Sequence, residues 1–173
     1  MEEDVQFAHY DSNVASLMQL GKWFDYMREN GVYDNTRIIL VADHGRGLYL
    51  NWDRVIDNGP DTDFFFPLLM VKDFNAKGFS FSDTFMTTAD VPTLATSGLI
   101  DNPTNPFTGN AINANAKYDR PFYAFMSYDW DTSKNNGNQF FPGTWYRVDN
   151  QNARDKRNWV MVGENTVLPD ALR

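Results

Sequence analysis

The residues best suited to chemistry in this sequence are Asp43 and His44, which stand together where an apolar run ends. Residues 38–42 are all apolar, a pattern typical of a strand buried on both faces, as in a parallel sheet. α/β proteins usually place ligands at the carboxyl ends of such strands. An aspartate oxygen beside a neutral imidazole nitrogen therefore predicts half of a divalent-metal site. The alternative is a plain turn that contains a hydrogen-bonded histidine.

Composition limits the classes of protein to which the chain can belong. Its 173 residues fit one domain of ordinary size. Fifteen Lys and Arg against 23 Asp and Glu give a net charge of −8, which argues against a nucleic-acid-binding surface. The absence of cysteine excludes disulfides and thiolate ligands. The apolar runs are far shorter than the roughly 20 residues that a membrane span needs, and the acidic start shows no signal peptide.

The first third predicts a helix followed by a strand, which is half of an α/β unit. Apolar residues recur at spacings of three and four over residues 12–29, with Asp11 or Ser12 able to cap the start and Gly31 just past the end. Residues 1–11 are polar and predict an entry segment before this helix. The strand expected at the metal pair covers residues 37–42.

The middle third predicts a strand and a short helix between long loops. Residues 45–63 are rich in Gly, Asp and Asn and predict a loop beside the metal pair. Pro67 indicates the start of a strand over residues 68–71, because proline donates no ladder hydrogen bond. A helix is expected over residues 91–97, with a proline in its first turn, and a loop over residues 101–120.

The last third predicts a small antiparallel sheet. Strand candidates cover residues 122–128, 145–148 and 159–162, and residues 132–138 predict a polar loop. The aromatic residues of this part have two interpretations: they form a carbohydrate-facing surface, or they pack on the α/β part as core. The residues concerned are Trp130, Trp145, Tyr146 and Trp159.

Several motifs, taken in order, resemble the second half of the alkaline phosphatase superfamily. Asn30-Gly31-Val32-Tyr33-Asp34-Asn35-Thr36 precedes the strand, and Asp43-His44-Gly45 closes it. Further matches are Phe66-Pro67-Leu68-Leu69, Asp90-Val91-Pro92-Thr93-Leu94 and Asn105-Pro106-Phe107-Thr108-Gly109-Asn110. The closest branches are the sulfatases, the phosphonate monoester hydrolases and the group of lipoteichoic acid synthases and phosphoethanolamine transferases. The resemblance covers residues 8 to 112.

This resemblance implies a fold class and a division of the chain. Residues 1–120 would be the C-terminal half of a sulfatase-like α/β domain, that is, the C-terminal portion of an alkaline-phosphatase-like sheet-and-helix fold. Residues 121–173 would be a small antiparallel β subdomain packed on it. The parent protein would lie outside the cytoplasm, in the periplasm or at the cell surface, anchored by membrane helices that this chain lacks.

The resemblance also implies a metal site that this chain fills only in part. Asp43 and His44 match the family's metal-binding pair, and the metal would be one divalent ion (manganese, zinc or magnesium) shared with residues missing here. Where the binuclear-zinc branch needs an aspartate the sequence has Val5, and no histidine follows His44, so a mononuclear site is favoured. Arg46 and His9 are candidates for substrate binding.

No nucleophile can be identified in the chain, so no catalytic residue is assigned. The expected function is that of a fragment of a metal-dependent hydrolase or transferase acting on phosphate or sulfate esters, inactive without the N-terminal half of the parent domain. The alternative is a non-catalytic sulfatase-like module, since a fold does not determine a function.

Overall fold

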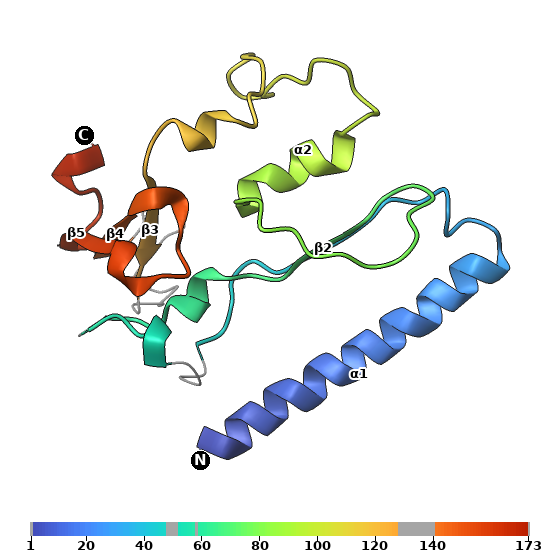
Figure 1. Cartoon of the computed structure of the whole chain (residues 1–173), viewed down its shortest axis with the longest axis horizontal. Helices are drawn as coiled ribbons and strands as arrows, with labels where there is room; N and C mark the ends of the chain where they lie inside the picture. The colour runs from blue at the N-terminus through green and yellow to red at the C-terminus, as the bar shows by residue number, and fades with distance from the viewer. Residues whose placement is uncertain (1, 48–51, 58, 128–140, 173) are drawn as a thin grey trace. The chain divides into compact units, whose positions relative to one another are not determined.

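The computed structural model describes the chain except for residues 1, 48–51, 58, 128–140 and 173. It is a mixed α/β structure with one long N-terminal helix, a short helix and two small antiparallel sheets (Figure 1). The chain forms two compact units. Unit 1 comprises Met1–Asp43 and Leu68–Asp83, and unit 2 comprises His44–Pro67 and Thr84–Arg173. The expected domain boundary at residue 120 stays a prediction.

The N-terminal helix α1, Glu2–Glu29, starts earlier than predicted. The expected helix start at residue 12 was wrong, because the segment before it contains no proline or glycine to end a helix. The Ser12 hydroxyl, expected to cap the helix, instead donates to the Ala8 carbonyl at 2.8 Å within it. The predicted end is confirmed: Gly31 adopts a left-handed φ of 69° just beyond α1.

Much of the apolar surface of α1 is exposed. Near its C-terminal end Met27 is buried, and the Phe24 ring lies 5.8 Å from that of Tyr33. Farther toward the N-terminus, Phe7 and Met18 are 66% and 62% exposed. Although α1 is 28 residues long, neither it nor any other helix in the described residues is apolar enough to cross a membrane.

The central strand of the prediction forms a two-stranded ribbon. Strand β1, Ile38–Val41, pairs antiparallel with β2, Leu69–Lys72, in the described part of the chain. The expectation of a parallel sheet was therefore wrong here, because an apolar run indicates burial without fixing strand direction. Burial is also uneven along β1, since Ile38 is 8% exposed and Val41 44%.

The short helix of unit 2, α2 (Val91–Thr96), confirms the predicted helix and its proline in the first turn. The Asp90 carboxylate accepts a hydrogen bond of 2.7 Å from the Thr87 amide and pairs with Lys117 at 3.0 Å. Partial burial acts to raise the pKa of Asp90, but these bonds outweigh it and the pKa is lowered. The carboxylate therefore stays ionised at neutral pH and fixes the 3-10 turn Thr88–Asp90 that precedes α2.

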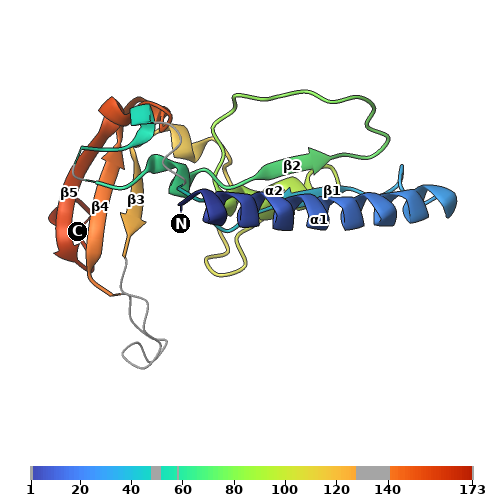
Figure 2. The ribbon, with the colours of Figure 1, turned by 90° about the horizontal axis from the view of Figure 1, so that it is seen from below.

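The predicted C-terminal sheet is confirmed. Strands β3 (Phe122–Met126), β4 (Gly143–Val148) and β5 (Trp159–Thr166) pair antiparallel in the order β3-β4-β5 (Figure 2). Its core is centred on Val148, which is fully buried. The predicted polar loop at residues 132–138 and Trp130 lie outside the described residues.

The aromatic side chains of this sheet serve mainly as core. Tyr146 and Trp159 are 5% and 7% exposed, and the Trp159 indole donates to the Ala153 carbonyl at 2.8 Å. Trp145 is half-buried, with its ring 4.8 Å from that of Phe125. Tyr146 and Trp159 are thus covered by protein and do not form a carbohydrate-facing surface in this structure.

Because Trp159 is a buried anchor of the sheet, Trp159→Ala should lower the free energy of unfolding by about 3–5 kcal/mol. Met161→Ala is the matched control on the same strand, because Met161 is 55% exposed. We expect the control to change it by less than about 1 kcal/mol. Urea denaturation followed by far-UV circular dichroism measures both variants, and equal losses would contradict the assigned core.

Candidate metal centre

Asp43 and His44 follow β1 after Ala42, and both are exposed. The boundary between the two units falls between these two residues. The Nδ1 atom of His44 lies 2.6 Å from the carbonyl oxygen of Gly45. A carbonyl can only accept, so this contact assigns the proton of a neutral imidazole to Nδ1 and the lone pair to Nε2. Metal-binding histidines usually have this arrangement, with one ring nitrogen donating to a backbone carbonyl.

The loop after the pair lies against residues 61–66. The Gly45 amide donates to the Phe64 carbonyl at 2.9 Å. A Cβ atom on Gly45 would collide with the Asp63 carbonyl oxygen and lie 2.8 Å from that of Phe66. A Cβ on Gly47 would lie 2.5 Å from the nearest atom of the Phe64 ring. Both positions therefore need glycine for close approach, as a tight loop beside the metal pair requires.

The segment that receives this loop is a short 3-10 turn, Thr62–Phe65, capped by Asp61. We call residues 61–66 the capped turn. The Asp61 carboxylate is fully buried and accepts from the Asp63 amide at 2.9 Å. The Asp63 carboxylate pairs with Arg54 at 2.5 Å. Thr62 is also fully buried, and its hydroxyl has no hydrogen-bond partner among the described residues.

The capped turn is fixed in turn to the C-terminal sheet. The Phe65 ring lies 5.0 Å from that of Trp159, and Ile56 packs against the same core. The Lys156 ammonium donates to the Val55 carbonyl at 3.2 Å. All these residues belong to unit 2, so His44 is connected to its sheet by a continuous series of contacts.

The remaining predicted site residues do not complete a metal site. His9 lies half-exposed on α1, and Arg46 is exposed in the loop after His44. In the described ranges no group of three or more His, Cys, Asp or Glu side chains could hold a metal. Asp43 and His44 have the chemistry of metal ligands, but a metal site needs at least one or two more.

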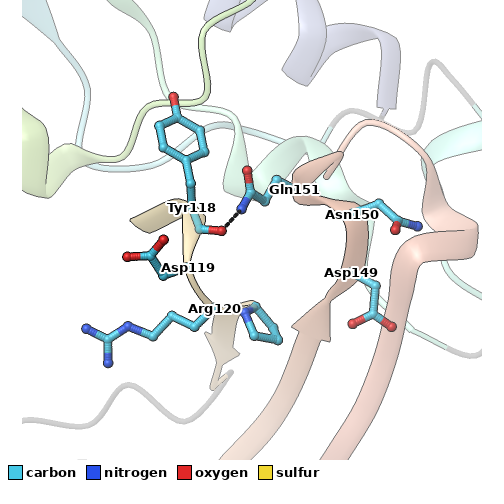
Figure 3. A pocket seen from close by; sticks show the side chains of 7 residues that line it. Tyr118, Asp119, Arg120, Asp149, Asn150 and Gln151 are labelled. Atoms are coloured by element: carbon cyan, nitrogen blue, oxygen red, sulfur yellow. Dashed lines mark hydrogen bonds between the residues drawn. The ribbon is translucent and has the colours of Figure 1, made fainter. Parts of the chain in front are cut away.

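A hollow of about 380 Å³ lies elsewhere in unit 2, between residues 118–121 and 149–151 (Figure 3). The Gln151 amide closes one side by donating to the Tyr118 carbonyl at 2.8 Å. Figure 3 shows the charged groups of Arg120 and Asp149 directed away from each other. A hydrogen bond from Arg147 lowers the pKa of Asp149. Asp149 is bonded to Arg147, which does not line the hollow, and Arg120 points away from Asp149. The hollow therefore lacks polar groups that converge on one point, as a ligand site would need.

Comparison with known proteins adds no relative: no family model, curated protein or solved structure matches this chain.

Sequence reasoning did not identify the capped turn, although it predicted a loop there. Asp61 was inconspicuous among the many Asp and Asn residues of residues 45–63. A local signal did exist, because Asp61-Thr62-Asp63 followed by three phenylalanines is a capping residue before an apolar run. The strand that contacts the turn, β5, lies far along the chain, so the residues around the turn do not predict this contact.

Because a methyl group on Gly45 would meet backbone oxygens of the capped turn, Gly45→Ala should destabilise unit 2 by about 1–3 kcal/mol. Gly21→Ala is the control, because nothing lies within 4 Å of a Cβ there and a helical glycine is unfavourable by about 0.5–1 kcal/mol. Urea denaturation should show a loss for the first variant and none for the second. A neutral Gly45→Ala would contradict the close approach.

Proposed function

We propose that this chain is the C-terminal part of a sulfatase-like enzyme of the alkaline phosphatase superfamily, acting on phosphate or sulfate esters. Asp43 and His44 are its contribution to a site for one divalent metal. The observation that carries the proposal is the 2.6 Å contact between His44 Nδ1 and the Gly45 carbonyl, which suits Nε2 for metal binding. The motif order described above supports the family assignment.

The rest of the site belongs to the N-terminal half of the parent domain. A bound divalent ion would lower the pKa of a nucleophile and attract an anionic ester oxygen. Within this chain, Asp43 would contribute an oxygen ligand and His44 a nitrogen ligand, as consecutive residues after β1. Arg46 would offer a cation to the ester group, and His9 a further polar contact to the substrate. Asp43→Ala should therefore abolish metal binding in the complete enzyme.

The same resemblance supports the wider setting of the parent. It would be anchored in a membrane and exposed to the periplasm or the cell surface. Manganese, zinc and magnesium all accept an oxygen and an imidazole ligand, so each is a candidate. The interaction partner of this chain is the missing half-domain, which would provide the nucleophile and the remaining carboxylate.

The experiment is a thermal melt of the chain with and without Mn²⁺ or Zn²⁺, repeated on the double variant Asp43→Ala/His44→Ala. A two-ligand site is weak, and metal at a concentration near its Kd should raise the Tm by only about 1–2 °C. The double variant should lose this shift. Because it removes the same residue types from α1, Asp11→Ala/His9→Ala is the matched control, and it should keep the shift.

The outcomes separate the proposals. A shift that persists in the double variant would contradict the metal pair. No shift in the wild-type chain, even with an added N-terminal half, would favour the non-catalytic module. Turnover of p-nitrophenyl phosphate or sulfate by the chain alone, lost in Asp43→Ala, would contradict its being a fragment.

A further inference from the structure

We infer that Asp61 is a positioning residue for His44, acting through the capped turn. The inference rests on the proposed function, because positioning matters only if His44 binds a metal. It adds a residue that lies outside the resemblance to the family's metal pair. A series of hydrogen bonds leads from the His44 imidazole through the backbone of Gly45 and Phe64 to the Asp61 residue.

The His44 imidazole is in contact with the backbone of the next residue. The side chain of His44 is exposed. Its Nδ1 lies 2.6 Å from the Gly45 carbonyl oxygen, and this contact selects the tautomer with the lone pair on Nε2. The direction of Nε2 therefore depends on where the Gly45 peptide is held.

The Gly45 peptide is itself held by the capped turn. Its amide donates to the Phe64 carbonyl at 2.9 Å, and the missing side chain lets its backbone approach Asp63 and Phe66. This bond orients the peptide groups on both sides of the Gly45 α-carbon. If the Phe64 carbonyl moved, Gly45 and the imidazole would move with it.

Asp61 holds the Phe64 carbonyl in place. The Phe64 amide donates to the Asp61 carbonyl at 3.2 Å, which closes the turn. The Asp61 side chain accepts from the Asp63 amide at 2.9 Å and satisfies an otherwise orphaned donor of the turn. An isolated bridge between Asp61 and Val55 fixes the residue from the other side.

Burial distinguishes Asp61 from the other acidic residues nearby. Asp61 is fully buried, whereas the side chain of Asp57 is 94% exposed. Asp63 is partly buried, and its carboxylate is used by Arg54 at 2.5 Å. A buried carboxylate is costly and persists where its bonds are needed. One such bond is to the Asp63 amide, at the start of the turn that receives Gly45.

Hydrogen exchange and imidazole NMR on the metal-free full chain test this inference. In Asp61→Ala we expect the Gly45 amide to exchange about five-fold faster, the effect of losing a typical N-cap. Long-range ¹H–¹⁵N spectra should show the His44 ring shifting from its Nδ1–H form toward a mixture of tautomers. The melting shift with Mn²⁺ should also fall.

Conservative and control variants make the result specific. Asp61→Ser and Asp61→Asn keep a side-chain acceptor for the Asp63 amide, so they should restore slow Gly45 exchange and the Nδ1–H form. Asp57→Ala, in the same loop, should leave both unchanged. Unaltered Gly45 exchange in Asp61→Ala, or an equal effect in Asp57→Ala, would overturn the inference.

A measurement on the wild-type chain covers the case in which Asp61→Ala does not fold. If the capped turn holds Gly45, the Asp63 and Gly45 amides should open together, with the same dependence on low denaturant. Different dependences would overturn the inference. These readouts need no metal. If the wild-type chain did not bind Mn²⁺, that result would count against the proposed function alone, and the effect of Asp61 on the His44 tautomer could still be measured.

Discussion

The packing of Phe65 on Trp159 is the contact on which the candidate metal centre depends most. It joins the loop after His44 to a sheet formed by residues far along the chain, with ring centroids 5.0 Å apart. Loops are usually the mobile parts of a domain, so a ligand on a loop needs such an anchor. Phe65 and Ile56 provide it by sharing the core around Val148. The sheet thus supports the loop that carries the candidate metal ligand His44.

The sequence was most informative where local patterns determine structure. It predicted α2 and the C-terminal sheet, because proline, glycine and β-branched or aromatic runs act locally. It failed at the start of α1, where polar residues without proline or glycine continue a helix. It also failed on the direction of β1, which depends on the partner strand and cannot be derived from the strand's own residues.

The candidate site was likewise predicted in part from the sequence and in part only from the structure. Residue types alone suggested Asp43 and His44 as ligands, because few other side chains bind divalent metals. The tautomer of His44 and the glycine at position 45 needed the structure, since both follow from contacts with the backbone of residue 45 and of residues 63–66. The importance of Asp61 could be found only from the structure. Its burial distinguishes it from the other acidic residues of the same loop, which the sequence alone does not do.

Two features of the chain bear on the fragment proposal: the small number of candidate metal ligands and the exposed apolar side chains of unit 1. As proposed ligands, Asp43 and His44 are fewer than a stable metal site requires, and the described residues contain no group of three or more such side chains. In the same unit as Asp43, the side chains of Phe7 and Val41 are 66% and 44% exposed, although apolar side chains usually stabilise a fold through burial. Under the proposed function, a further half-domain would supply the remaining ligands and cover apolar side chains of this kind, so both features are consistent with the fragment proposal.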